Sequence, residues 1–206
     1  MRVRNWFKTV PALVIIGSIL FLVLAIGGGL LLWGSNFANN MVHSQLSEQK
    51  ITFPAKGSPA LDPKEFPGLQ QYAGQAVDNG PKAKAYANEF IRKHLQSIAG
   101  GKTYSDVSGA VQAAKAQGKT PDPQLVAQQD TLFRGETLRG LLLNVWGWAT
   151  VGAIAWWVGI AAWLGALAVL GALVIGFIVH ERQLKQATST MTTTAPINGR
   201  TPVTVS

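Results

Sequence analysis

Histidine and carboxylate side chains are the residues of this chain that could hold a catalytic metal, and they are few. The histidines are His43, His94 and His180. A mononuclear iron site needs two histidines and a carboxylate with open coordination positions, so His43, His94 and Glu89 are the set with the right residue types. No metal-binding spacing joins them in the sequence. We therefore expect no metal, no cofactor and no catalytic residue.

Nucleophilic chemistry lacks its usual patterns as well. The chain has no cysteine, which excludes disulfides, thiolate metal sites and a cysteine nucleophile. It has no G-x-S-x-G motif for a serine nucleophile. Its glycine run, Gly27 to Gly29, lies inside an apolar stretch and not between a strand and a helix, so it does not predict a phosphate-binding loop. These patterns predict a protein that is not an enzyme.

A short polar segment before the second apolar stretch is the first candidate binding set. Glu136 and Arg139 stand three residues apart on a predicted helix and are expected to pair. Arg134 and Arg139 would bind lipid phosphate or the carboxylates of a partner, with Asn144 close by in the sequence. An ordinary solvated face beside a membrane is the alternative for these residues.

Two long uncharged stretches lie on either side of Arg134, Glu136 and Arg139 in the sequence and are predicted membrane helices. Residues 10–33 contain no charged residue, and about 20 apolar residues suffice to span a bilayer core. This stretch is longer than the apolar core of a cleavable signal peptide. Residues 141–179 are 39 uncharged residues, which as one helix would measure about 60 Å, or twice the hydrocarbon thickness.

Basic residues at both ends decide how often the second stretch crosses. Arg2, Arg4 and Lys8 precede the first span, and Arg182 and Lys185 follow the second stretch. The positive-inside rule places both ends in the cytoplasm and favours two spans over three. We predict a cytoplasmic N-terminus (1–9), transmembrane helices at 10–33 and 155–179, an apolar interfacial lead-in helix (141–154) and a disordered cytoplasmic tail (180–206).

Residues 34–140 are predicted to form an extracytoplasmic α-helical domain. They contain 12 Lys and Arg against 9 Asp and Glu without a basic stripe, so nucleic acid is not an expected partner. Residues 69–77 and 81–99 are predicted helices, and Thr103 to Asp106 forms a capping box for another. Pro123 begins a helix that meets no proline before Pro196 and can enter the apolar stretch directly. The expected fold is an all-α membrane protein, with two transmembrane helices, helical extensions and this small domain.

Small residues in the second span form one helical face. Their spacing of four, three, four and four places them on one side, the pattern that lets membrane helices approach closely. This face either packs on the first span, which offers Ser18, Ala25 and Gly29, or receives a partner helix. Trp146 and Trp148 in the lead-in are predicted to contribute to an interfacial aromatic belt or to the same partner contact. The face consists of Ala161, Gly165, Ala168, Ala172 and Gly176.

The stretches YAGQAVDNGPKAKAYANEFIRKHLQSIAGGKTYSDVS and TLFRGETLRGLLLNVWGWATVGAIA resemble a family of small actinobacterial two-span membrane proteins. The resemblance covers about residues 5–179, and TLFRGETLRGLLLN is its most specific part. Members often carry the label of aromatic ring-opening dioxygenase, but they have no settled function to transfer. The resemblance implies a single plasma membrane and draws attention to Arg134, Gly135, Glu136, Arg139 and Asn144.

Three functions compete on these grounds. The first is a non-enzymatic accessory or scaffold subunit that docks onto a larger plasma-membrane assembly through its transmembrane and juxtamembrane helices. The second is an extracytoplasmic module that binds or senses a lipid or small molecule, and the third is an enzyme. We favour the first, with membrane lipids and a membrane-protein partner or a second copy of the chain as expected partners.

Overall fold

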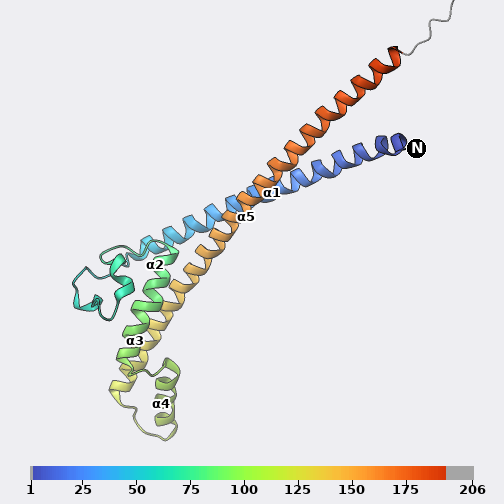
Figure 1. The fold of residues 1–206 in the computed structure, drawn as a ribbon. Helices are drawn as coiled ribbons and strands as arrows, with labels where there is room; N and C mark the ends of the chain where they lie inside the picture. The colour runs from blue at the N-terminus through green and yellow to red at the C-terminus, as the bar shows by residue number, and fades with distance from the viewer. Residues whose placement is uncertain (1, 194–206) are drawn as a thin grey trace, which may run out of the picture. The chain divides into compact units, whose positions relative to one another are not determined.

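The computed structural model describes the backbone of residues 2–193 and the side chains of residues 12–186. Two long helices, α1 (Arg2–Gln49) and α5 (Pro123–Thr193), begin and end the described chain, and a run of short helices lies between them in the sequence (Figure 1). No β-strand occurs among the described residues, and Thr52 and Ala76 form an isolated antiparallel bridge. The predicted all-α fold is confirmed. The short helices are η1 (Pro59–Leu61), η2 (Pro67–Tyr72), α2 (Gly80–Ala85), the π-helical η3 (Tyr86–Ile91), α3 (Arg92–Ile98) and α4 (Tyr104–Ala116).

The chain divides into two compact units. The first consists of Met1–Gly29 and Gly159–Ser206, and the second is Leu30–Val158. Helices α1 and α5 each contribute residues to both units. Over Ala12–Gln49 and Pro123–Gln186, these helices are long and apolar enough to cross a membrane. The described residues therefore hold two candidate membrane-spanning helices.

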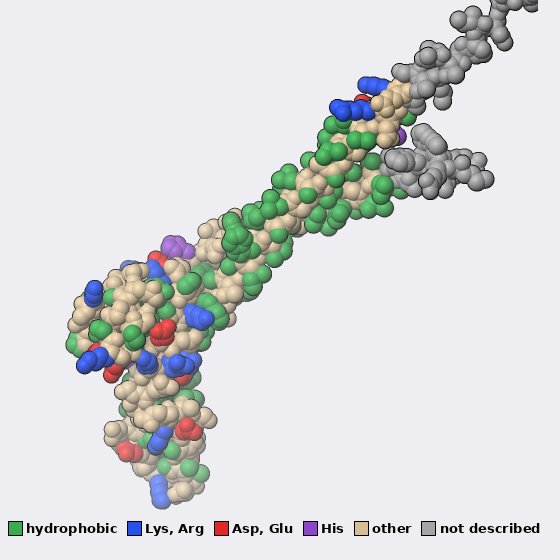
Figure 2. Space-filling model, in the orientation of Figure 1, with side chains coloured by type: hydrophobic (Ala, Val, Ile, Leu, Met, Phe, Trp, Pro, Cys, Tyr) green, Lys and Arg blue, Asp and Glu red, His purple; other side chains and the backbone are tan. Residues whose placement is uncertain are grey.

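The first unit is a pair of helical segments whose outer surface is apolar. Leu13, Ile16 and Leu22 on α1, and Leu164 and Ile175 on α5, are each more than half exposed. Figure 2 shows hydrophobic side chains covering this pair, with charged side chains of α5 close to its end. Exposed leucine and isoleucine in such numbers are unusual for a surface in water and ordinary for one in lipid.

The second unit has a conventional buried core. Leu61, Leu69, Val77, Leu132 and Leu142 are almost completely buried and belong to one apolar cluster. Burial of each such side chain contributes about 1.5–3 kcal/mol relative to exposure. Charged side chains of both signs are scattered over the visible surface of this unit (Figure 2). The unit therefore has the buried apolar core of a folded domain together with exposed charged side chains.

Helix ends in the second unit follow the predicted capping rules. The Thr103 hydroxyl accepts a hydrogen bond from the Asp106 amide at 3.2 Å, and an Asp106 oxygen accepts one from the Thr103 amide at 2.9 Å. Asp122 accepts from the Gln124 amide at 2.8 Å before Pro123 begins α5. Each cap satisfies amide groups that lack a partner inside the helix. The predicted starts of α4 and α5 are confirmed.

Two sequence predictions about local structure are wrong. Residues 69–77 are not one α-helix, because η2 ends at Tyr72, Gly74 adopts a left-handed φ of 71°, and Ala76 then pairs with Thr52. The predicted tail 180–206 is not irregular throughout, because α5 continues to Thr193. No proline interrupts the helix before Pro196, and threonine costs a helix only a few tenths of a kcal/mol per residue. Residues 194–206 lie outside the described residues.

Candidate partner-binding surface

Small residues bring the two helices of the first unit into close contact. A Cβ atom added to Gly28 would lie 3.2 Å from the backbone oxygen of Gly159 and 3.2 Å from the Ala162 Cβ. A Cβ added to Gly17 would lie 2.7 Å from Leu173. Gly17 lies against Leu173, and the later residue Gly28 lies against the earlier residue Gly159. The two helices are therefore antiparallel. The absence of side chains at these glycines permits the close approach.

The predicted small-residue face of α5 is not the face that α1 covers. Ala166 and Gly159 are buried, and Ala162, Val169 and Leu173 are half-buried, which defines the covered face. At 100° per residue, this face lies about 100° around α5 from the predicted one. Of the predicted residues only Gly165 is half-buried, near Leu24. The other four are exposed, namely Ala161, Ala168, Ala172 and Gly176.

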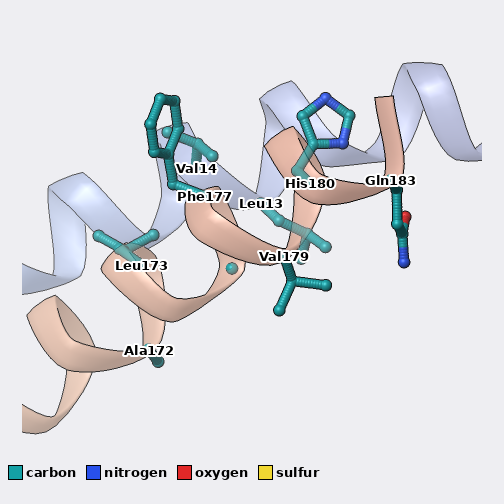
Figure 3. A pocket seen from close by; sticks show the side chains of 9 residues that line it. Leu13, Val14, Ala172, Leu173, Phe177, Val179, His180 and Gln183 are labelled. Carbon is teal, nitrogen blue, oxygen red and sulfur yellow. The ribbon is translucent and has the colours of Figure 1, made fainter. Parts of the chain in front are cut away.

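An apolar groove opens beside the exposed face. Its volume is about 410 Å³, and it is lined by Leu13 and Val14 of α1 and by residues 172–183 of α5. Figure 3 shows Ala172 and Leu173 at one end of the groove and the polar side chains of His180 and Gln183 at the other. The groove contains two residues of the predicted face, Ala172 and Gly176. Its chemistry suits an apolar helix or an acyl chain.

Aromatic side chains of the second unit lie at one level of the helix pair. A Cβ added to Gly152 would contact Ala38 and the backbone oxygen of Ser35, and Figure 1 shows that α1 and α5 run in opposite directions here also. This register places Trp33 at the height of Trp156 and Trp157. Trp33 and Trp157 are 69% and 68% exposed, and Phe37 stacks on Trp33 with centroids 6.0 Å apart. Exposed tryptophans at one height are typical of a membrane interface.

The lead-in 141–154 packs with one face and exposes the other. Leu142 and Val145 belong to the core of the second unit, whereas Leu141, Trp148 and Val151 are each about half exposed. Trp146, predicted for the aromatic belt or the partner contact, is half-buried. It lies beside Gly80, and the Lys84 ammonium is 4.3 Å from its ring centroid. Trp148 is therefore the predicted lead-in tryptophan that stays available to a partner.

The four polar candidate residues do not form one site. Arg134 is exposed and pairs with Asp130 at 3.0 Å. Arg139 pairs with Glu136 at 3.0 Å, as expected from their spacing, and its other arm donates to the Asn88 Oδ1 at 3.3 Å. The Nε atom of Arg139 is buried and makes no hydrogen bond. Arg139 thus ties α5 to η3, whereas Asn144 lies apart beside Trp148 in a shallow hollow.

The histidines considered for metal binding lie in different surroundings. The His43 Nδ1 donates a hydrogen bond to the backbone carbonyl oxygen of Asp78 at 3.1 Å. His94 stacks on Phe66 with centroids 5.4 Å apart and contacts the Phe90 ring. Among the side chains that the structure describes, no three His, Asp or Glu residues gather as metal ligands would. His94 acts here as an aromatic side chain in the core wall.

A cavity with charged walls in the second unit was missed by sequence reasoning. Its volume is about 390 Å³, and Lys84, Asn88, Glu89 and Trp146 line it together with residues of η2. The π-helical turn η3 sets the positions of Asn88 and Glu89. Irregular turns of this kind often occur at functional sites, but no sequence pattern predicts them.

Comparison of the chain with protein-family models, with curated proteins and with solved structures finds no match. The resemblance to actinobacterial two-span membrane proteins therefore stays a prediction.

Proposed function

We propose that this chain is a non-enzymatic accessory subunit of a larger plasma-membrane assembly. It crosses the membrane twice, with both ends in the cytoplasm and residues 34–140 outside. It docks onto its partner through the small-residue face of α5, made of Ala161, Ala168, Ala172 and Gly176 with Gly165 at its edge. The partner is a transmembrane helix of another protein.

The distribution of apolar and charged residues supports the membrane setting. Exposed apolar side chains cover α1 from Leu13 to Phe37. Beyond that point, α1 exposes Asn39, Asn40 and His43. The exposed Trp33 and Trp157 lie where the apolar surface gives way to the polar one. Aromatic residues concentrate at this level in membrane proteins. Basic residues flank the other ends of both helices.

The uncovered small-residue face is the observation that carries the docking proposal. In lipid, apolar surface alone does not drive helices together, and close packing between small residues supplies much of the attraction. Helix α1 already has a complementary face on α5 at Gly159, Ala162 and Ala166. The second small-residue face is therefore not needed for the pairing of α1 with α5, and its smooth surface suits another helix.

The exposed side of the lead-in extends this surface. The turns of α5 that carry Leu141, Trp148 and Val151 lie at the level of the polar end of α1, beyond Phe37. In the proposed membrane, these three side chains lie outside the hydrocarbon core. Apolar surface in that position is typical of a protein contact. Asn144 adds a polar group beside Trp148. A partner with an extramembrane helix would contact both regions together.

Affinity purification from native membranes in mild detergent tests the proposal. We expect a defined membrane protein to co-purify in fixed ratio, and the double variant Ala168→Leu with Gly176→Leu to release it. Gly171→Leu is the matched control, because Gly171 is also exposed with no atom near a Cβ, yet it lies about 100° from the face. Purification of the native chain alone, or equal loss in the control, contradicts the proposal.

A further inference from the structure

The cavity of the second unit lies along one face of the helical run from α2 into η3, and its lining includes Pro81, Ala85 and Asn88 at the spacing of one helix face. Lys84 is in the last turn of α2, and Glu89 is in η3, five residues further on. In a regular α-helix, residues five apart point about 140° away from each other. A π-turn, closed by i→i+5 hydrogen bonds, widens the helix so that residues five apart come to one side. Lys84 and Glu89 accordingly line the same cavity.

Two opposite charges face this cavity without neutralising each other. The Lys84 ammonium lies over the Trp146 ring, and the Glu89 carboxylate lies across from Gly68, with its Oε2 3.0 Å from where a Gly68 Cβ would be. Among the described residues, neither Lys84 nor Glu89 makes an ion pair or a side-chain hydrogen bond. The cavity thus offers a separate site for an anion and for a cation.

A fixed amide complements the charges. The Oδ1 of Asn88 accepts a hydrogen bond from Arg139, and Glu136 holds Arg139 from its other side. This contact directs the Asn88 oxygen toward Arg139, so the Nδ2 group is the part of this amide that remains to donate to a ligand. Aromatic walls from Tyr72 and Trp146 suit the short carbon skeleton of a ligand and its ammonium group.

We propose that this cavity binds a free, compact zwitterion of the amino-acid type. The ligand's ammonium lies at Glu89, and its carboxylate lies between Lys84 and Asn88. An opposite charge on each side recognises both ends of the ligand, as charge-assisted hydrogen bonds require. This assignment uses only residues of the second unit and does not depend on the partner of α5.

The height of the cavity selects a free solute over a lipid headgroup. Trp146 precedes Trp157 by eleven helical residues, or about 16 Å along α5. With Trp157 at the edge of the hydrocarbon, the headgroup layer extends about 5–8 Å beyond it. The cavity then lies past the headgroups, where an ethanolamine lipid does not reach but a dissolved zwitterion does.

Calorimetric titration of the full chain in nanodiscs, with the standard L-amino acids added one at a time, tests this assignment. We expect at least one of them to bind, and we expect its amide and its deamino acid, which each lack one charge, to bind at least about tenfold more weakly. Glu89→Gln and Lys84→Gln should weaken binding by a similar factor. Glu65→Gln and Lys115→Gln change exposed charges outside the cavity lining and should leave binding unchanged.

Other outcomes overturn the assignment. Binding of no amino acid contradicts it, as does binding that Glu89→Gln and Lys84→Gln leave intact. Nanodiscs with and without phosphatidylethanolamine separate the lipid source. Protection of the second unit against thermal unfolding by that lipid alone would show a headgroup site instead. Circular dichroism of each variant verifies that the helices are retained.

Discussion

Gly28 of α1 lies against the backbone oxygen of Gly159 in α5, at a distance that leaves no room for a side chain. An added Cβ would be 3.2 Å from that oxygen and 2.8 Å from the Trp163 ring. The neighbouring Gly27 has open space around it. The pairing of the two helices in the first unit therefore depends on one glycine of the run and not on the whole run.

Gly28→Leu should separate the helices of the first unit. We expect a loss of about 1–3 kcal/mol in stability from overpacking, seen as a lower unfolding temperature in detergent micelles. Gly27→Leu is the control and should have little effect, since its side chain enters open space. Equal unfolding temperatures of the two variants would show that Gly28 is not at the contact.

Gly80 and Gly109 should respond to alanine with opposite signs. A Cβ on Gly80 would lie 2.3 Å from the Cβ of Ala149, so Gly80→Ala must push α2 away from α5 and destabilise the second unit by about 1–3 kcal/mol. Gly109 is an exposed residue in the middle of α4, and no atom lies near a Cβ added to it. Gly109→Ala should stabilise by up to about 1 kcal/mol through helix propensity. Urea unfolding followed by circular dichroism measures both, and stabilisation by Gly80→Ala would refute the packing.

The start of α4 should lose protection in acid. The Thr103 amide, and secondly its hydroxyl, donate to Asp106 and hold the pKa of its carboxyl below the ordinary value. A pKa lowered by folding stabilises the cap at pH values above the ordinary range and loses that effect as the pH falls through the lowered value. Amide exchange in the first turn, corrected for intrinsic rates, should speed up below about pH 4. Asp106→Asn should remove this pH dependence, and a wild-type cap insensitive to acid would contradict it.

Single cysteines can test the proposed topology, because the native chain has none. Gln112 is exposed in α4, and Ser189 follows the second span. A membrane-impermeant maleimide on intact cells should label Gln112→Cys fully and Ser189→Cys only after permeabilisation, at least about a tenfold difference. Labelling of both on intact cells would contradict two spans and support three. Labelling of Ser189→Cys alone would show that the topology is the inverse of the proposed one.

The sequence predicted those helix starts that are determined by a capping residue or a proline close by in the chain. The Thr103 and Asp106 box, Asn79 before Pro81, and Asp122 before Pro123 each determine a helix start through contacts within four residues. Residues 180–193 were predicted to be irregular from their composition, but no helix-breaking residue stops α5 there. Residues 69–77 were predicted to be one helix, but Gly74 adopts a left-handed φ and ends it. These errors concern segments where the local signal is weak.

The candidate surfaces depend on contacts between distant residues, which the sequence predicts poorly. Helix α5 has two faces of small residues, one at Gly159, Ala162 and Ala166 and one at Ala161, Ala168 and Ala172. The approach of Gly17 and Gly28 of α1 to the first face distinguishes them. The burial of Trp146 likewise depends on Gly80 and Lys84, far away in the sequence. The pairing of Glu136 with Arg139 was predictable, but the reach of Arg139 to Asn88 was not.

Photocrosslinking from the small-residue face tests the docking proposal most directly. A benzophenone amino acid replaces Ala168 in one variant and Gly171 in a second, both exposed positions of α5, and each is irradiated in native membranes. The proposal predicts a crosslink from position 168 to one defined membrane protein, and no such product from position 171. Crosslinks to lipid alone at both positions would show that this face binds no protein, and the accessory-subunit function would then be wrong.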